Sequence, residues 1–586
     1  MNIACLDLPY ASALEQAGHK VLPLRVPEGG LVHLPGLLRE HGFEPDLFIQ
    51  HERLGARLIC CGLEDMPCPT AFISIDAHLN MYWHKYYARL FDLVFTPHVS
   101  LYAALPQERR HPQVKRFGPA GYARPFRPHA ERRHPLAFAG MITEHRPARK
   151  LMVDMLTKEC GLYLPDAPLP HTAMLDLFAD ARLTPNEAIA LEVNYRLFEA
   201  CSCGALVISQ DVGEDQNSHF EPGLEFETYA HSLELLEKIR FYSRNLQAAE
   251  KIGRAGWQRV QACHLPAHRI ASLLEAAQAV RGRASGEDAG RFLWLTLLQM
   301  GRTGIFRRPA EWFMERSAEV KASGLIQAMR LLLMVESAHE GNILYSPSTA
   351  EVYKKQAAEL AAAILYNKAH QSNLDCNLAG AMTSLALERL DWAGLFWLRQ
   401  LNALGKSLPE SVAASVTSLR APYDHYLAWG KLLNALGRRA EVGFGFKTGT
   451  GQIPLCAFEC LLLARETAAK GERTWLSELH EVARRVPAFS FWDMGFLAEL
   501  SLWDQANWRK QAHYALSALN NFRVDTGLSE LSEARQKALL AGEGREFYAE
   551  LEDRSSSGYI ISALRDFRGI PPQMRPKSPP AGLTHV

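Results

Sequence analysis

Short apolar runs alternate with helix-length amphipathic segments over the first 125 residues of the chain. Strands separated by helix-length segments pair in parallel through crossover helices, so this pattern predicts a doubly wound α/β domain. A helix that starts near Tyr10, stops at Gly18 and leads directly into an apolar run is a frequent opening of such a domain. The predicted strands cover residues 3–6, 21–24, 45–49, 70–75 and 93–96.

The same alternation begins again after a loop at residues 122–135 that is rich in proline, arginine and histidine. A strand is predicted at 136–139 and a helix at 147–160. Further along, a glycine-terminated helix precedes a strand at 205–209, and a helix at 267–280 closes the unit. Such sheets bind ligands outside the carboxyl ends of their strands, so two successive units predict a ligand-binding cleft between them.

Strand signals disappear beyond a small, polar stretch at residues 282–290, and helical patterns take over. One segment, 382–397, has the pattern helix, tight turn, helix and resembles a tetratricopeptide unit, although the period of about 34 residues does not emerge along the chain. The helices are predicted at 325–338, 351–365, 380–390, 392–404, 426–436 and 455–469. The tryptophans of this region have the spacing of core residues: Trp294, Trp312, Trp392, Trp397, Trp429 and Trp475.

At 586 residues the chain is too long for a single hydrophobic core. We therefore expect an α/β protein with two Rossmann-like domains, followed by an all-α domain of helical hairpins. The α/β domains are expected at 1–125 and 126–281, and the helical domain at 291–565. The remaining residues, 566–586, form a proline-rich tail that is expected to be disordered.

The amino-acid composition of the chain limits the kinds of molecule that it is expected to bind. The chain has 64 basic and 64 acidic side chains and a formal net charge of zero, which argues against nucleic acid or anionic lipid as the main partner. Its eleven cysteines are scattered without the spacing of a zinc site, which favours reduced thiols. The first residues have no signal-peptide pattern, and no apolar run approaches the roughly 20 residues of a transmembrane helix. We therefore expect a cytoplasmic protein without a transmembrane segment.

The run from Arg196 to Ser209 carries the most information about chemistry. It predicts an amphipathic helix that stops at Gly204 and is followed at once by an apolar strand. Glu192, Arg196 and Glu199 have the spacing i, i+4 and i+7, which places them on one face of a helix. A solvated ladder of ion pairs is one interpretation. The other is a sugar-nucleotide site, in which the carboxylate accepts both ribose hydroxyls and the guanidinium pairs with a diphosphate.

The ordered spacing of several motifs resembles the CgeB-like glycosyltransferases over roughly residues 1 to 280. In the second α/β domain the matching positions are Phe138, Gly140, Arg146, Asn186, Arg196, Phe198, Glu199, Cys203, Gly204, Phe220, Gly223, Tyr229, Ile252, Gly253, Gly256, Arg259, His264 and Arg269. Upstream, residues 70–96, with Ile75-Asp76 and Phe91-Asp92, are similar to the N-terminal domain often found with this family, and Arg124-Pro-Phe-Arg-Pro128 is similar to its interdomain loop. The resemblance implies the two-Rossmann (GT-B) architecture and a nucleotide-activated sugar donor.

The resemblance assigns the donor to the second domain. It implies that Glu199 binds the ribose and that Arg146 and Arg196 lie near the diphosphate. Asn186 belongs to the same ordered set of positions as Arg196, and Gly140 precedes a loop that offers backbone amides to a phosphate. Basic side chains and helix N-termini stabilise the leaving diphosphate in such folds, so no metal is expected to be required. The chain differs from many retaining enzymes of this architecture at one position. Those enzymes carry a second glutamate before the ribose-binding one, and the corresponding residue here is Leu191. Retaining stereochemistry therefore does not carry over.

Asp76 and His78 follow the predicted strand at 70–75 and would face the cleft from the first domain. Either could accept the proton of an acceptor hydroxyl as it attacks the sugar, and Asp76 is the first choice. A turn aspartate that caps the next helix is the alternative. His264 and His268 have Pro266 between them and no evident third ligand, so they are expected to pack or cap rather than to bind metal.

These features favour a glycosyltransferase whose helical domain binds part of an acceptor, either a protein or a glycan. Helical arrays build extended concave surfaces, so a protein acceptor makes the best use of that domain, for example O-glycosylation of a surface or flagellar protein. Two alternatives stay open. One is a non-catalytic scaffold with a degenerate transferase domain, and the other is a transferase for polysaccharide or lipid-linked glycan.

Overall fold

The structure is a computed structural model, and it describes residues 1–485 with several gaps. The gaps are residues 54–56, 106, 143–146, 189–191, 230–231, 281–287, 321–322, 339–346, 406–418, 440–455, 470–471 and 473. The predicted proline-rich tail and the last part of the predicted helical domain lie outside the described residues. By their contacts the described residues form two compact units, residues 1–116 with 274–485, and residues 117–273.

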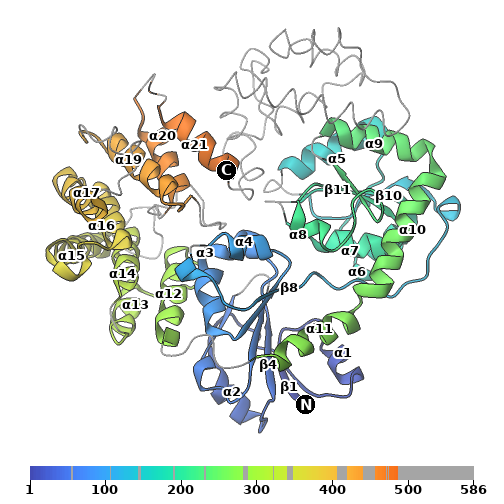
Figure 1. Cartoon of the computed structure of the whole chain (residues 1–586), viewed down its shortest axis with the longest axis horizontal. Helices are drawn as coiled ribbons and strands as arrows, with labels where there is room; N and C mark the ends of the chain where they lie inside the picture. The colour runs from blue at the N-terminus through green and yellow to red at the C-terminus, as the bar shows by residue number, and fades with distance from the viewer. Residues whose placement is uncertain are drawn as a thin grey trace. The chain divides into compact units, whose positions relative to one another are not determined.

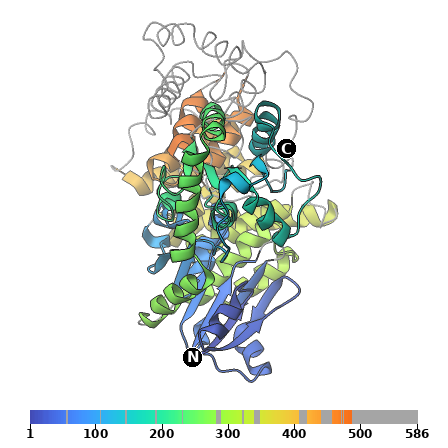
Figure 2. The ribbon, with the colours of Figure 1, turned by 90° about the vertical axis from the view of Figure 1, so that its right-hand side faces the viewer.

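The first unit contains a six-stranded sheet in the order β2-β1-β4-β6-β7-β8, in which every neighbouring pair is parallel. Figure 2 shows these blue strands side by side near the N-terminus. The predicted doubly wound sheet is confirmed, and the short last strand is the one that the sequence pattern missed. The strands are β1 (Asn2–Leu6), β2 (Lys20–Leu24), β4 (Leu47–His51), β6 (Thr70–Ile73), β7 (Leu93–Thr96) and β8 (Val114–Arg116), and β3 (Gly30–His33) pairs separately with β5 (Leu58–Cys61).

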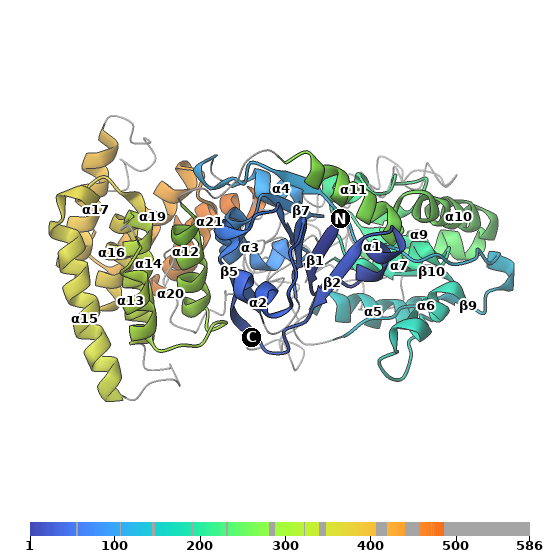
Figure 3. The same cartoon turned by 90° about the horizontal axis from the view of Figure 1, so that it is seen from below.

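Helix α3 (Ala77–Tyr87) connects this sheet to the helical region. All of its residues except Leu79 are buried, including Trp83 and Tyr86. A helix that buries every face must be covered on both sides. Helix α12 (Ala289–Arg302) packs against α3, as Figure 3 shows. The other helices of the first domain are α1 (Ala11–Gln16), α2 (Leu34–Glu40) and α4 (Val99–Ala103).

The helical region extends outward from α12 (Figures 1 and 3). Helix α14 packs on α12, α15 and α16, and α16 forms an antiparallel pair with α17. The predicted helices are therefore confirmed where the structure describes them, while a tetratricopeptide repeat stays a prediction. Trp397, Trp429 and Trp475 are buried, and Trp294, Trp312 and Trp392 are half-buried. The helices are α13 (Ala310–Ser317), α14 (Gly324–Ser337), α15 (Pro347–Tyr366), α16 (Leu374–Ala386), α17 (Leu390–Leu404), α19 (Pro422–Ala435), α20 (Ala457–Thr467) and α21 (Thr474–Arg485).

A buried charge cluster reinforces this attachment. Asp375, at the start of α16, accepts a hydrogen bond from Arg109 of the first domain at 3.3 Å and another from Arg438. Burial alone would raise the pKa of Asp375, but Arg109, Arg438 and Lys85 hold it below its ordinary value. The carboxylate thus stays ionised between side chains of the sheet domain and of the helical region. The helical region and the first α/β domain form one structural unit.

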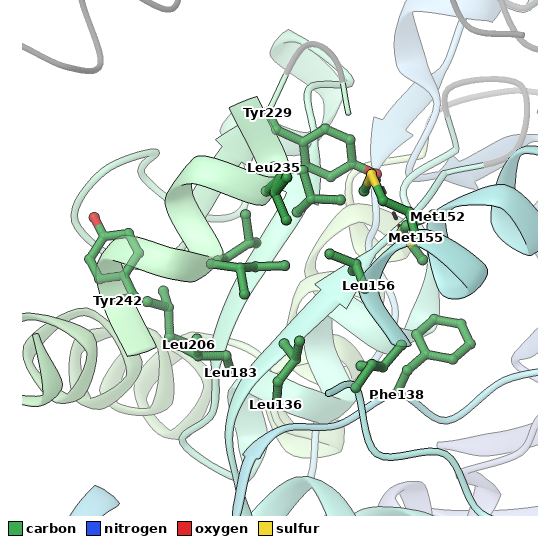
Figure 4. Close-up of a cluster of buried hydrophobic side chains, with 14 of the residues drawn as sticks. Leu136, Phe138, Met152, Met155, Leu156, Leu183, Leu206, Tyr229, Leu235 and Tyr242 are labelled. Atoms are coloured by element: carbon green, nitrogen blue, oxygen red, sulfur yellow. Dashed lines mark hydrogen bonds between the residues drawn. The ribbon is translucent and has the colours of Figure 1, made fainter. Parts of the chain in front are cut away.

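The second unit is built on a four-stranded parallel sheet in the order β12-β11-β10-β9. Figure 4 shows the apolar side chains that cover one face of it, among them Leu136, Leu183 and Leu206. A second cluster, with Phe178, Leu197 and Phe220, covers the other face. The elements are β9 (His134–Leu136), β10 (Ala181–Asn186), β11 (Leu206–Gln210), β12 (Glu227–Tyr229), α5 (Pro147–Cys160), α6 (His171–Ala179), α7 (Tyr195–Ser202), α8 (Glu214–Asn217), α9 (Ser232–Arg244), α10 (Leu246–Cys263) and α11 (Pro266–Gln278).

Strand β10 is central in this sheet, although the sequence pattern did not predict it. Pro185 lies near its end, and proline normally indicates an edge strand or no strand, because it cannot donate to the ladder. The pairing with β9 ends at Leu183↔Leu136, so Pro185 lies beyond that ladder and pairs only with Ile208 of β11. Proline is tolerated here for that reason. The predicted fold class, two parallel α/β domains with a helical region, is confirmed.

All eleven cysteines lie in the described part of the chain, and all are free thiols. Among the described residues, no helix is long and apolar enough to cross a membrane.

Candidate donor and acceptor sites

Helix α7 positions the candidate donor residues, and it begins later than predicted. Asn194 has an extended backbone and its side-chain oxygen accepts from the amide of Leu197 at 3.3 Å, so the helix starts at Tyr195. Glu192 therefore precedes the helix, and the prediction that it shares a helical face with Arg196 and Glu199 is wrong. Arg196 and Glu199 are both buried, which also excludes a solvated ladder.

Arg196 is fixed at the carboxyl ends of β9 and β10. Its Nε donates to the carbonyl of Ala139 at 3.0 Å and its Nη1 donates to Oδ1 of Asn186 at 2.9 Å. The guanidinium lies over the ring of Phe138, 4.5 Å from its centroid. Burial and the nearby Arg149 lower the pKa of Arg196 to about 9. A guanidinium at the carboxyl edge of a parallel sheet is suited to an anionic ligand.

Asn186 links β10 to β11 at the same edge. Its amide nitrogen donates to Ser209 Oγ at 2.9 Å, and its oxygen accepts from Arg196 and from Asn194. Three of the predicted donor residues, Gly140, Asn186 and Arg196, are thus brought together. Arg146 lies outside the described residues, and the fifth predicted donor residue, Glu199, is described below.

Gly140 lets the guanidinium of Arg196 approach the main chain closely. A Cβ at this position would collide with Nη2 of Arg196 and would lie 3.2 Å from the ring of Phe138. The sequence indicated a phosphate loop at this glycine, and the structure shows a steric reason for glycine here.

Gly140→Ala is expected to displace the Arg196 guanidinium and to weaken nucleotide binding. Overpacking of this kind costs about 1–3 kcal/mol, so the unfolding temperature should also fall. Titration calorimetry with a nucleoside diphosphate checks the first effect and a thermal melt the second. Gly161→Ala is the control. Gly161 also has a positive φ angle, but a Cβ added there would meet no atom within 4 Å. Equal nucleotide affinity in Gly140→Ala and the wild type would contradict this role of the glycine.

A buried ion pair beside Arg196 was missed by sequence reasoning. Arg149, on α5, donates from Nε to Glu187 at 2.8 Å and from Nη1 to the carbonyl of Met141 at 3.1 Å. Its guanidinium also lies over Phe138, 5.8 Å from the centroid. Both partners are almost fully buried. The only feature of the sequence that pointed to this ion pair is that Glu187 directly follows Asn186, a predicted donor residue.

Glu199 lies one helical turn beyond Arg196. Its Oε1 is 3.2 Å from Nε2 of His171, whose side chain is 46% exposed while that of Glu199 is 11% exposed. The ring of Tyr122 lies 4.9 Å from that of His171. Burial raises the pKa of Glu199 in spite of Arg196 and His171, which act in the opposite direction. Burial and this carboxylate raise the pKa of Tyr122 to about 12.

The two candidate acceptor-side residues lie in the first unit, at the junction of β6 and α3. Asp76 occupies the N-cap position of α3 and is half-buried. His78 is only 1% exposed, and its ring lies 4.8 Å from that of His98 at the start of α4. The two histidines thus follow neighbouring parallel strands, β6 and β7.

Glu52 fixes this junction, and sequence reasoning did not single it out. Its Oε2 accepts from the amides of Ile75 at 2.8 Å and Asp76 at 2.7 Å, and its Oε1 accepts from Asn80 at 2.6 Å. His84 Nε2 lies 3.1 Å from the same carboxylate. Burial alone would raise the pKa of Glu52, but His84, the Asp76 amide and Arg57 bring it well below the ordinary 4.5.

Glu52→Gln is expected to destabilise the first unit by about 2–3 kcal/mol, because an amide group must face partners that all donate. The pKa of Glu52 is depressed in the native state. Its contribution is therefore complete above the unfolded value near 4.5 and is lost as the pH falls towards the native value. Urea melts between pH 3 and 7 should show a smaller loss of stability on acidification in the variant than in the wild type. Parallel pH profiles would contradict this assignment.

His264 and His268 have the packing and capping roles that were predicted. His264 is buried, with Nε2 2.9 Å from the carbonyl of His219 and Nδ1 2.9 Å from Arg269 Nη2. His268 Nδ1 accepts from the amide of Leu265 at 3.1 Å, just before α11. Within the described ranges, no group of three or more histidine, cysteine, aspartate or glutamate side chains is arranged to hold a metal ion.

Residues 161–275 match the family model described as glycosyl transferase-like. This part of the chain is similar to glycosyl transferase-like domains. The match contains Asn186, Arg196 and Glu199, so the predicted glycosyltransferase class is confirmed, while the CgeB-like subfamily stays a prediction. No curated protein matches the chain.

Several solved structures are similar to about half of the chain. Sucrose-phosphate synthase from Thermosynechococcus elongatus is 12% identical, with 48% of this chain and 100% of that chain covered and a TM-score of 0.36. The glycosyltransferase SnogD from Streptomyces nogalater is 16% identical, with coverage of 47% and 99% and a TM-score of 0.29. A UDP complex of MnaA from S. aureus is 11% identical, with coverage of 47% and 94% and a TM-score of 0.31.

Proposed function

We propose that this protein transfers a sugar from a nucleotide-sugar donor to a hydroxyl group of an acceptor protein. The observation that carries the proposal is the arrangement of Gly140, Asn186 and Arg196 at the carboxyl edge of a parallel sheet. Asn186 and Arg196 also lie inside the segment that matches the transferase family. Ligands of such sheets bind at this edge. The two α/β domains are consistent with the GT-B architecture.

The donor would be held by the second unit. Arg196 would contact the diphosphate, because a guanidinium recognises phosphate oxygens with paired donors. Glu199 would accept hydrogen bonds from the ribose hydroxyls, and Arg146 would add a second cation near the diphosphate. Arg196 and the main-chain amides after Gly140 would stabilise charge on the leaving group, so we propose that transfer needs no metal ion.

The first unit would bind the acceptor. Asp76 is the better candidate than His78 for the residue that takes the proton of the attacking hydroxyl, because it is half-buried while His78 is enclosed. The helical region is continuous with this unit through α3 and α12, which supports its role in presenting an acceptor protein. O-glycosylation of a surface or flagellar protein is the reaction that we propose. Eleven free thiols support a cytoplasmic location.

The test is a transfer assay with UDP-, GDP-, dTDP- and CMP-sugars and a pool of peptides that contain serine and threonine. We expect mass spectrometry to find the mass of one sugar on a peptide, from one class of donor and in the presence of EDTA. Release of free sugar without peptide modification would favour a glycan or lipid-linked acceptor. If no donor is consumed at all, the chain is a non-catalytic scaffold.

A further inference from the structure

Asp7 is held in an unusual backbone conformation at the end of the first strand. Its φ angle is +58°, in the left-handed region that few non-glycine residues adopt, although aspartate and asparagine tolerate it better than the others. Among the described residues, Glu388 is the other non-glycine residue with positive φ, and it follows helix α16, where this conformation is common. Asp7 follows a strand and has no such explanation. Strain of this kind concentrates at functional sites.

The position of Asp7 in the sheet is also distinctive. From β1 the chain moves to β2 on one side, and β4, β6, β7 and β8 then continue on the other side. The strand order therefore reverses between β1 and β4. In open parallel sheets, ligands bind outside the carboxyl ends of the strands at this reversal. Asp7 comes directly after β1, and Arg53 comes two residues after the end of β4.

Asp7 and Arg53 form a bidentate pair across this point. Arg53 Nε donates to Oδ2 of Asp7 at 2.9 Å and Nη2 donates to Oδ1 at 2.8 Å. The Asp7 side chain is 16% exposed and that of Arg53 is 19% exposed, so the pair is partly open to solvent. Arg53 is fixed in turn, because Arg57 Nη1 donates to its carbonyl at 2.5 Å. Glu52, between β4 and Arg53, anchors the neighbouring β6–α3 junction.

The chemistry of the pair selects a class of ligand. Each carboxylate oxygen uses one of its acceptor sites on Arg53 and keeps others for a further donor. The pair is neutral as a whole, so it offers little attraction to a diphosphate. A hydroxyl group can donate to such a carboxylate without the cost of bringing a second charge to the site.

We propose that the Asp7–Arg53 pair binds and orients the hydroxyl compound that accepts the sugar. This inference rests on the proposed function and adds an acceptor-binding residue to it. The left-handed turn at Asp7 places the carboxylate at the strand-order reversal, and β4, which carries Arg53 at its end, separates β1 from the strand that leads to Asp76.

The decisive variant is Asp7→Asn. Asparagine tolerates the left-handed conformation, keeps the size of the side chain and removes the charge. Asp46→Asn is the matched control, because the Asp46 carboxylate accepts from the amide of Asn2 at 2.7 Å, at the opposite end of the same two strands. Thermal melts should show that both variants are folded.

The probe acceptor is glycerol, with the nucleotide-sugar that the wild type consumes. The readout is the ratio of glyceryl glycoside to free sugar among the products. Loss of a hydrogen bond to a charged group should lower this ratio by about 10- to 100-fold in Asp7→Asn. Asp46→Asn should give the wild-type ratio.

An unchanged ratio in Asp7→Asn would overturn the assignment of the pair while leaving sugar transfer intact. Free sugar without any glyceryl glycoside from the wild type would also count against an open hydroxyl-binding site. If the wild type releases neither product from any donor, it is the proposed function that fails.

Discussion

Asp375→Ala is expected to destabilise the first unit by about 3–5 kcal/mol, the usual cost of removing one partner from a buried ionic cluster. Asp375 is 13% exposed and neutralises Arg109 and Arg438, with Lys85 nearby. Without the carboxylate, these cations would stay buried together between the sheet domain and the helical region. Urea unfolding followed by tryptophan fluorescence measures the loss.

Asp391→Ala is the matched control for this experiment. Asp391 also lies in the first turn of a helix and also pairs with an arginine, Arg389, but its side chain is 61% exposed. Exposed pairs contribute little to stability, so this variant should unfold like the wild type. If Asp375→Ala also unfolds like the wild type, the cluster does not join the helical region to the first domain.

Glu199→Gln is expected to reduce sugar transfer by about 100-fold or more, since two hydrogen bonds from ribose hydroxyls to a charged acceptor are weakened. Glutamine keeps the shape of the side chain, so the protein should remain folded. The loss should appear in donor affinity and in kcat/KM. Glu221→Gln, an exposed substitution in the same unit, is the control. Undiminished turnover in Glu199→Gln would remove this residue from the donor site.

The pH dependence of donor binding gives a second readout on Glu199. Burial raises the pKa of this carboxyl, so the ionised form that accepts hydroxyl donors is lost earlier on acidification than for an exposed glutamate. Donor affinity should therefore decrease as the pH falls from neutral towards the ordinary value of 4.5 and below. A donor affinity that is constant over this range would contradict an ionised Glu199 at the ribose.

Local patterns predicted the fold well because they depend on neighbouring residues. The helix that ends at Gly204 and the strand after it were read directly, since Gly204 has φ +73° and terminates the helix as expected. The helix start was wrong because Glu192 fits a helical period equally well, while the cap at Asn194 decides the boundary. Hydrophobic and polar periodicity alone does not tell a residue inside the helix from one that precedes its first turn.

The missed residues depend on partners that are distant in the chain. Glu52 lies in the run His51-Glu-Arg53, which has the appearance of a solvated charged segment, yet its partners are the amides of Ile75 and Asp76. One local feature of the sequence indicated, in part, that the helical region packs against the first α/β domain. Helix α3 carries a broad face of large aromatic side chains, Tyr82, Trp83, Tyr86 and Tyr87. Its other half, with Asn80, His84 and Lys85, gives no such signal and is buried as well.

A nucleotide titration of the full-length chain tests most directly whether the second unit is a sugar-nucleotide site. Thermal melts with UDP, GDP, dTDP and CMP should show stabilisation by one of them, by about 2.7 kcal/mol at a concentration 100 times its Kd. Arg196→Met should abolish this shift, because it keeps the apolar contact with Phe138 and removes the guanidinium. If no nucleotide raises the unfolding temperature of the wild type at millimolar concentration, the second unit is not a donor site.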